Sequence, residues 1–438
     1  MVNYIRQWKF LFAFLLIFSL AGTQISLAGT ASEEKVKKLE EQIKILADEI
    51  EAIKSASVTE PTVYETEFGL APAASKVYRV DQGISFGGYG ELLVGNVKEG
   101  DGNDVVDTLR LVLYNGYKYN DNIIFNSEIE FEHGTTGSNK DGKSGSASVE
   151  FAYIDFLISD AFNLRGGLLL TPFGTVNEIH EPTTFYGVGR PEVERRIIPS
   201  TWRESGAGAH GTFDLGNAGE LSYRAYAMSS ADARGFKASD NRSLRIKGNR
   251  ARFEDMAFVG RIEYDPTPGI RVGGSFYYGN TGQGEKVNGQ TIDGLFKMYS
   301  VDGQFQYAGL DLRALGVWTS LDDAALINQM KEYTGSKSVG EEQSGWYVLG
   351  AYNIFSVFNS ASRYMEYLAP FFRYEKFDTQ EKVPAGYERD PANDRTQYTI
   401  GLNYKPISNV VIKAEYQNLD TAAGESEDQY NFGIGYVF

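Results

Sequence analysis

Cysteine is absent from the 438-residue chain, and histidine occurs only three times. The absence of cysteine excludes the disulfide framework that many small secreted domains use. His133, His180 and His210 stand in none of the spacings that mark nucleophile or metal motifs. The sequence therefore predicts no enzyme, no metal site and no cofactor.

Long apolar runs and positive charge are also scarce. After residue 20, no stretch approaches the roughly 18 apolar residues that a membrane-spanning helix needs. Acidic residues outnumber basic ones by 58 to 42, which gives a formal net charge of −16. This acidic balance argues against a nucleic-acid partner.

Glycine and aromatic residues are abundant instead. The chain holds 48 Gly, 28 Tyr and 27 Phe, yet its mean hydropathy is slightly negative, at −0.32. A lipid-facing β-barrel has this mixture, because every second residue of each strand faces water.

The last eleven residues alternate between two faces. The aromatic and aliphatic residues share one face: Tyr430, Phe432, Ile434, Tyr436 and Phe438. Such a strand would aggregate as an open edge. In a closed barrel it pairs with the first strand and turns its apolar face to lipid. The alternative is the edge strand of a soluble β-sandwich.

The amino terminus has the features of a secretory signal. Arg6 and Lys9 precede the apolar run 10–20, and Ser26 and Ala28 stand at the positions of a cleavage site. We expect residues 1–28 to be a signal peptide. Together with a barrel, this address predicts the bacterial outer membrane.

A short coiled coil is expected at 32–54, on the periplasmic side. Its apolar residues are spaced 3-4-3-4-3 and leave the charged residues off the seam: Val36, Leu39, Ile43, Leu46, Ile50 and Ile53. The alternative is an amphipathic helix packed on its own barrel. Residues 55–80, with Pro61 and Pro72, are expected to form a linker.

From residue 84 the pattern changes to strands, which predicts an all-β, antiparallel transmembrane barrel over 84–438. Sixteen strands are expected: 84–96, 107–119, 122–133, 147–159, 162–171, 202–214, 219–230, 256–265, 269–279, 296–307, 309–320, 345–355, 366–378, 395–405, 408–418 and 428–438. Short turns alternate with long loops, as in outer-membrane barrels. Only 356–365 is long where a short turn is due.

The polar alternates of these strands are expected to face the lumen. A charge on the lipid face near the midplane would cost about 2–4 kcal/mol. The predicted lumen wall includes Arg110, Glu128, Glu130, Glu132, Arg165, Arg224, Arg261 and Arg271. A sixteen-stranded barrel leaves an aqueous channel. The alternative is that these charges pair with one another and only fill the wall.

The connection 172–201 is long and unusually apolar for an exposed loop. We expect it to fold into the lumen and to narrow the pore, because long loops without sheet partners are usually functional or disordered. Its charges and the arginine after it would set the constriction: Arg190, Arg195, Arg196, Arg203, Glu178, Glu181, Glu192 and Glu194. Such charges select ions by sign. A transverse field, an anion ladder and a merely rigidifying Arg–Glu network all remain open.

A second loop, 231–255, is rich in arginine and lysine. Its basic residues are Arg234, Lys237, Arg242, Arg245, Lys247, Arg250 and Arg252. It could funnel anions, bind lipopolysaccharide phosphates, contact a neighbouring subunit or remain solvated.

The segment 164–208 resembles the phosphate-selective porin O and P family. The resemblance rests on Leu-Arg-Gly-Gly-Leu-Leu-Leu-Thr-Pro-Phe-Gly before the loop and on Trp-Arg-Glu-Ser-Gly-Ala-Gly after it. The closing Tyr-Val-Phe and the strand count extend it over 84–438. The resemblance implies a trimeric, sixteen-stranded porin in which Arg190, Arg195, Arg196 and Arg203 contact anions.

The expected function is a channel for passive diffusion of small hydrophilic solutes, with anions favoured by the loop arginines. The expected partners are membrane lipid, lipopolysaccharide, the solutes and two further copies of the chain. The alternative function is a structural tether that links the outer membrane to the cell wall through the coiled coil.

Overall fold

The computed structural model describes residues 44, 66–97, 104–357 and 366–438. The predicted signal peptide lies outside these residues, as do the predicted coiled coil except for Lys44 and the first part of the predicted linker. The chain divides into two compact units, Met1–Glu60 and Pro61–Phe438. In the described residues, no helix is both long and apolar enough to cross a membrane.

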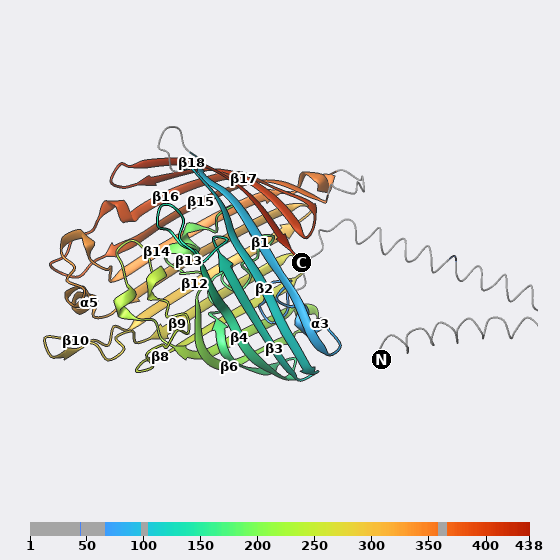
Figure 1. Cartoon of the computed structure of the whole chain (residues 1–438), viewed down its shortest axis with the longest axis horizontal. Helices are drawn as coiled ribbons and strands as arrows, with labels where there is room; N and C mark the ends of the chain where they lie inside the picture. The colour runs from blue at the N-terminus through green and yellow to red at the C-terminus, as the bar shows by residue number, and fades with distance from the viewer. Residues whose placement is uncertain (1–43, 45–65, 98–103, 358–365) are drawn as a thin grey trace, which may run out of the picture. The chain divides into compact units, whose positions relative to one another are not determined.

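The second unit is a closed barrel of sixteen antiparallel strands (Figure 1). In chain order the strands are β1 (Gly83–Val97), β2 (Val105–Asn120), β3 (Ile123–Glu132), β4 (Ser146–Ser159), β5 (Phe162–Leu170), β6 (Arg203–Asp214), β7 (Glu220–Ser229), β8 (Met256–Thr267), β9 (Ile270–Gly279), β12 (Phe296–Tyr307), β13 (Leu310–Leu321), β14 (Glu342–Tyr352), β15 (Tyr367–Lys382), β16 (Asp394–Ile407), β17 (Val410–Thr421) and β18 (Ser426–Val437). The predicted fold class is therefore confirmed, and each predicted strand overlaps an observed one.

The barrel closes through its last strand. β18 pairs with β1, with Tyr89 opposite Val437. The N–H of Phe438 donates to the carbonyl of Gly88 at 2.9 Å, and the N–H of Gly88 donates to the carbonyl of Phe438 at 3.0 Å. The blue β1 and the red β18 accordingly lie side by side in Figure 1. Closure removes both sheet edges, as a membrane barrel requires.

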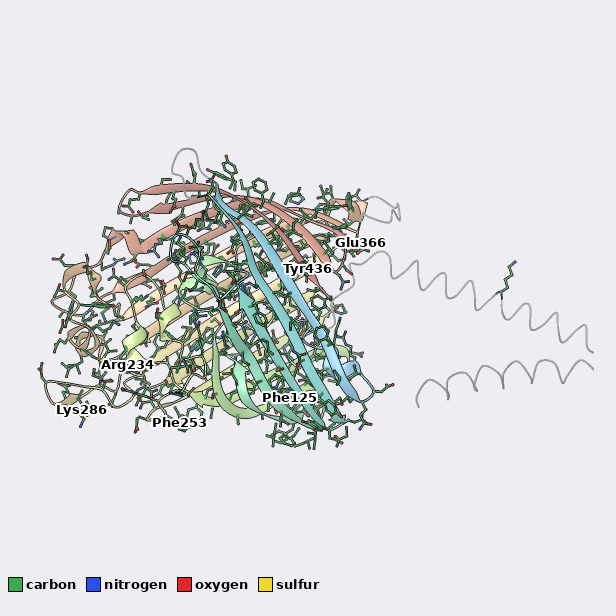
Figure 2. All side chains as sticks on the ribbon, viewed as in Figure 1. Phe125, Arg234, Phe253, Lys286, Glu366 and Tyr436 are labelled. Atoms are coloured by element: carbon green, nitrogen blue, oxygen red, sulfur yellow. The ribbon has the colours of Figure 1, made fainter. Side chains whose placement is uncertain are left out.

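Apolar side chains cover the outside of the wall. In β16, Ile400 is 56% exposed, whereas its neighbour Thr399 is fully buried. The same alternation runs through β18, where Tyr436 (labelled in Figure 2) is exposed and Val437 is buried. A ring of exposed aromatic and aliphatic side chains is stable in lipid but not in water. The outer face is therefore the membrane face.

Short turns join the strands at one end of the barrel and long connections at the other. At the turn between β2 and β3, the side chain of Asn120 accepts hydrogen bonds from the N–H groups of Asn122 (2.9 Å) and Ile123 (2.8 Å). Asparagine favours tight turns for this reason. The connection between β14 and β15 is long at the short-turn end, as predicted, and residues 358–365 of it are outside the described part.

In the described part of the second unit, the helices are short and lie between strands or before β1. They are α3 (Lys76–Arg79), α4 (Glu192–Arg196) and α5 (Ala324–Met330), with 3-10 turns η1 (Gly216–Ala218), η2 (Ala233–Gly235), η3 (Arg242–Leu244), η4 (Gly335–Lys337), η5 (Ile354–Val357) and η6 (Pro391–Asn393). A two-stranded ribbon, β10 (Lys286–Val287) with β11 (Gln290–Thr291), stands outside the barrel sheet. The core lies inside the barrel, where three connecting segments pack against the wall.

Candidate channel constriction

The first of these segments, the constriction loop, is the connection 171–202 between β5 and β6. Its apolar side chains rest on glycines of the inner wall. A Cβ on Gly345 would lie 2.9 Å from Ile197 Cδ1, and a Cβ on Gly435 would lie 2.5 Å from Pro182 Cβ. The wall glycines therefore make room for the loop, because any larger residue would collide with it.

A buried carboxylate fixes the middle of this loop. Glu194, in α4, accepts hydrogen bonds from the N–H groups of Thr175 and Val176, both at 2.8 Å. The hydroxyl of Tyr347, which points inward from β14, donates to the same carboxylate at 2.7 Å. The loop is thus tied to itself and to the wall by one fully buried group.

Charged side chains of β17 hold the far part of the loop. Lys413 donates to the carbonyl of Gly187 at 2.7 Å. Glu415 accepts from the N–H of Val188 at 2.9 Å. Both side chains point inward from adjacent alternate positions of the strand, so the loop reaches across the lumen to the last strands.

The second segment is the basic loop 230–255. The N–H of Asn241 donates to the carbonyl of Arg196 at 2.8 Å. The hydroxyl of Thr379, in β15, donates to the carbonyl of Ala238 at 2.6 Å. This loop therefore lies over the constriction loop, between it and the opposite wall, rather than extending into solvent.

The third segment is the chain before β1. The N–H groups of Ala73 and Ala74 donate to Glu181 Oε1 at 2.9 and 3.2 Å, and Asn126 of β3 donates to the carbonyl of Ala74 at 2.9 Å. Residues in the range 55–80 were expected to form a linker. The described part of that range packs inside the barrel, because it carries apolar side chains such as Val77 that the wall buries.

A cavity of about 570 Å³ remains between the two inward-folded loops and the wall of β1, β2 and β16 to β18. Its charged lining comprises Arg110, Arg190, Arg195, Arg196, Arg242, Glu91, Glu132, Glu192, Glu415 and Glu427. Four of the eight residues predicted for the constriction are among them: Arg190, Glu192, Arg195 and Arg196. Arginine and glutamate are thus equally frequent, and the pattern of pairing decides which charge faces the cavity.

One glutamate is shared by two of the arginines. Glu192 pairs with Arg195 at 2.7 Å and with Arg196 at 2.5 Å, both within the single turn of α4. Arg190 and Arg242 form no ion pair with any carboxylate in the described part of the chain. Three positive charges on this side of the cavity therefore remain unneutralised.

The crowding of arginines shows in the ionisation of the loop groups. Burial, together with the neighbouring Arg195 and Arg190, lowers the pKa of Arg242. Burial alone would raise the pKa of Glu192, but Arg195 and Arg196 outweigh it and hold this pKa below its ordinary value. The contribution of the neighbouring arginines to each shift is the one expected where positive charges lie close together.

The other predicted constriction residues lie outside the cavity lining. Arg203 is only 3% exposed and pairs with Glu150 at 2.6 Å. Glu178 pairs with Arg224 at 3.0 Å. Glu181 and Glu194 accept backbone hydrogen bonds, as described above. These four residues fix the loop in place rather than facing the cavity.

All five of the predicted lumen-wall arginines are paired. The pairs are Arg110 with Glu91 (2.8 Å), Arg165 with Asp155 (2.8 Å), Arg224 with Glu263 (2.5 Å), Arg261 with Asp302 (2.7 Å) and Arg271 with Asp265 (2.8 Å). The alternative in which wall charges neutralise one another applies to these residues. Glu128 and Glu130 are buried, whereas Glu132 reaches the cavity.

A second cavity, of about 230 Å³, opens near the short turns of β6 to β9. Its lining includes Phe68, Gly69, Arg224, Glu263 and Arg271. The chain before β1 forms one side of it, so this segment stands at the short-turn entrance of the lumen.

A buried group of two carboxylates and one imidazole joins the loop to the wall. His180 Nε2 lies 3.3 Å from Glu128 Oε1 and 3.2 Å from Glu150 Oε2. Burial alone lowers the pKa of His180, but Glu128 and Glu150 raise it, to about 9 in sum.

Arg242 was not among the predicted constriction residues, because its loop was expected to be a separate feature. The signal that could have identified Arg242 was the high arginine content of its loop.

The chain has the fold of known outer-membrane porins. OmpF of Salmonella typhi, solved in complex with daunomycin, superimposes with a TM-score of 0.53 at 14% identity, over 82% of this chain and 98% of OmpF. The anion-selective porin from Comamonas acidovorans superimposes with a TM-score of 0.51 at 11% identity, over 81% of this chain and 99% of that porin. At these identities the likeness concerns the fold.

No protein-family model matches the chain. A protein of Aquifex aeolicus (strain VF5), described as uncharacterized, is 38% identical over 389 residues, which span 87% of this chain and 86% of that protein. Identity at this level over most of both lengths indicates common descent and a shared fold. The chain therefore belongs to the same family as this Aquifex aeolicus protein, and it carries the outer-membrane porin fold.

Proposed function

We propose that the protein is a channel in the bacterial outer membrane for passive diffusion of small hydrophilic solutes, with a preference for anions. The observation that carries the proposal is the arginine-lined cavity of about 570 Å³ inside a closed, lipid-facing barrel. Two loops narrow the lumen around this cavity without filling it. Charged side chains at such a constriction select solutes by sign.

The preference for anions follows from the arrangement of the loop arginines. Arg195 and Arg196 share Glu192, and Arg190 and Arg242 stand without a carboxylate partner among the described residues. Guanidinium groups bind carboxylate and phosphate through paired hydrogen bonds. Small organic acids and phosphates are therefore the proposed solutes. The resemblance to phosphate-selective porins implied the same role for Arg190, Arg195 and Arg196, whereas Arg203 is paired with Glu150.

Assembly as a homotrimer in a lipopolysaccharide-containing leaflet is part of the same proposal. It is supported by the porin fold and by the broad apolar outer face of the barrel. Chemical cross-linking of the detergent-solubilised protein, followed by electrophoresis, distinguishes a trimer from a monomer.

Swelling of proteoliposomes tests the proposed permeability. Vesicles that contain the protein should swell in a neutral sugar of pentose size and faster in the sugar acid of the same size. Empty vesicles are the control for leakage. Folded protein that admits neither solute would refute the channel, and equal rates for the two solutes would refute the anion preference.

A structural tether is the second candidate. The observation in its favour is the firm attachment of residues 66–80 inside the barrel through Glu181 and Asn126. A chain anchored in this way can transmit tension from the preceding residues to the barrel. Co-sedimentation with purified peptidoglycan tests this candidate, and loss of co-sedimentation on deletion of 32–54 would support it.

A further inference from the structure

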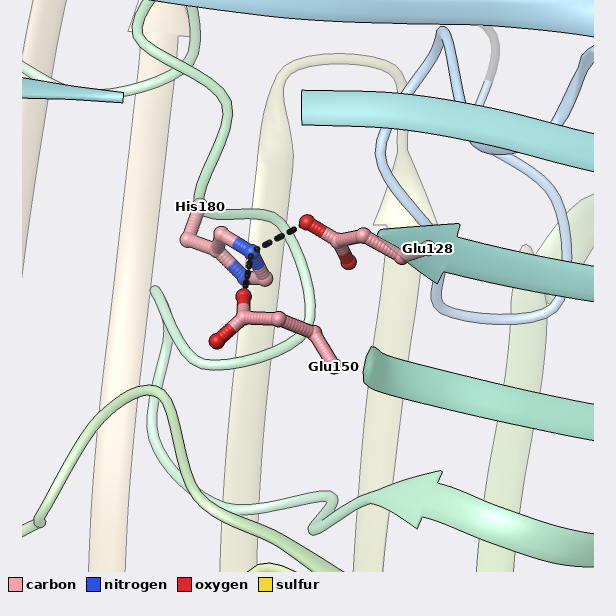
Figure 3. A group of neighbouring side chains, drawn as sticks. All are labelled: Glu128, Glu150 and His180. Atoms are coloured by element: carbon pink, nitrogen blue, oxygen red, sulfur yellow. Dashed lines mark hydrogen bonds and ion pairs between the residues drawn. The ribbon is translucent and has the colours of Figure 1, made fainter. Parts of the chain in front are cut away.

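The buried group formed by Glu128, Glu150 and His180 comes from three separate elements. Glu128 stands in β3, Glu150 in β4 and His180 in the constriction loop, and Figure 3 shows the three side chains converging on one point. The exposed fractions are 0%, 0% and 2%. One donor atom from each side chain lies within 4.8 Å of the other two.

The hydrogen bonds of His180 determine what its second nitrogen faces. Nδ1 lies 2.8 Å from the carbonyl oxygen of Asn177. A carbonyl oxygen only accepts, so Nδ1 carries a proton. Nε2 then faces two carboxylate oxygens, so a second proton on the ring, a proton on one of the carboxyl groups or a metal ion must lie between them.

The distances favour a metal ion over a proton. A charge-assisted N–H to carboxylate hydrogen bond is typically about 2.7–2.9 Å long, whereas these two contacts measure 3.3 and 3.2 Å. A single N–H shared between the two oxygens would make only two long, weak contacts. Ligand atoms held tetrahedrally at about 2.1 Å from a zinc ion lie about 3.4 Å from one another, which is close to the 3.3 and 3.2 Å between His180 Nε2 and the two carboxylate oxygens.

Outer contacts also match those of a metal site. A ligating histidine usually donates its other N–H to a carbonyl or carboxylate, as His180 does to Asn177. The second oxygen of Glu150 accepts from Arg203 at 2.6 Å and from the hydroxyl of Thr201 at 2.9 Å. The imidazole and one carboxylate are therefore already oriented.

Two fully buried oxygen atoms beside the group have no partner among the described protein atoms. They are Glu128 Oε2 and the hydroxyl of Tyr89. The ring of Tyr89 packs edge-on against that of His180, with 6.2 Å between their centres. A buried polar atom without a partner is costly, and a cation at this point would give Glu128 a second interaction.

We propose that Glu128, Glu150 and His180 bind a divalent zinc ion that pins the constriction loop to β3 and β4. The donor set of two oxygens and one imidazole nitrogen suits zinc, whereas calcium and magnesium prefer oxygen alone. Three protein ligands leave the fourth position for a water molecule or for the free oxygen of Glu128. The ion has a structural role, which is separate from the proposed anion preference.

Zinc binding to the full-length protein in detergent tests the proposal. The protein is treated with a chelator, dialysed and titrated with zinc, and the bound metal is measured by mass spectrometry. One zinc ion per chain is expected. Substitution of cobalt should give the visible absorption of a four-coordinate nitrogen–oxygen site.

His180→Gln and Glu150→Gln should each weaken zinc binding by at least about tenfold. The loss of a residue that only supports a metal ligand already weakens binding by about that much. His210→Gln is the matched control, since His210 is also buried and faces one carboxylate, Asp155, at 3.2 Å. Heat-modifiable migration in electrophoresis verifies that each variant folds. Absence of zinc binding by the unaltered protein, or equal binding by folded His180→Gln and His210→Gln, would overturn the proposal in favour of a protonated His180 between two carboxylates.

Discussion

Replacement of both Arg190 and Arg242 by alanine should reduce the preference for anions, because these cavity arginines have no carboxylate partner in the described structure. A sphere of 570 Å³ has a radius of about 5 Å, so an anion at its centre lies about that far from each guanidinium. At this distance in water a unit charge contributes about 0.8 kcal/mol. Screening at 0.1 M salt reduces this to about 0.5 kcal/mol.

The two arginines together thus contribute about 1 kcal/mol, which stabilises chloride and destabilises potassium by the same amount. Their loss should therefore lower the ratio of chloride to potassium permeability by about thirtyfold. The measurement is the reversal potential across a planar bilayer in a potassium chloride gradient centred on 0.1 M. At 1 M salt the effect should largely disappear, because the screening length falls to about 3 Å.

Arg250→Ala is the matched control, because Arg250 belongs to the same loop but is exposed and does not line the cavity. It should leave the permeability ratio unchanged. An unaltered ratio in the folded double variant, with conductance steps of normal size, would show that the loop arginines do not set the selectivity.

Three further predictions concern the wall and the docked chain before β1. Ile400→Arg, on the lipid face of β16, should lower the free energy of unfolding in lipid vesicles by about 2–4 kcal/mol. Val106→Arg, near the loop end of β2, should lower it by only about 0–1 kcal/mol. Equal losses for the two variants would contradict the assigned membrane face. Glu181→Ala leaves the buried N–H groups of Ala73 and Ala74 without an acceptor, which should lower the free energy of unfolding by about 1–3 kcal/mol. This variant should increase proteolysis within 66–80 and should also increase conductance. Glu181→Gln should change both quantities much less. Burial raises the pKa of Glu181 to about 7, against the lowering effect of the N–H groups of Ala74 and Ala73. Because this folded-state pKa lies above the unfolded value, the folded protein binds more protons, and the free energy of unfolding should fall as pH rises from about 5 to about 7. Glu181→Gln should flatten that slope.

Much of the barrel was predictable because strands carry their pattern locally. The alternation in β18 and the turn-forming Asn120 each act through residues a few positions apart. The apolar content of 172–201 likewise indicated burial, and the structure shows where that burial occurs. Such features need no knowledge of which distant strands meet.

The details of the site depend on contacts that no local pattern encodes. Arg203 was predicted to lie at the constriction, but no local pattern could show that Glu150, 53 residues away, occupies its guanidinium. The residues that gather around His180 are likewise dispersed over two strands and a loop, so no motif spacing marks them. The docking of the chain before β1 was missed for the same reason, since its partners Glu181 and Asn126 lie far along the sequence.

The loop arginines are proposed to give this diffusion channel a positive constriction. The reversal potential of the unaltered protein in a planar bilayer, under a potassium chloride gradient at low ionic strength, reports the sign of the field there. We expect discrete conductance steps and a reversal potential whose sign reports chloride as the more permeant ion. A sign that reports potassium would show that Glu91, Glu132 and the other cavity carboxylates control the field, and folded protein without conductance would contradict the channel itself.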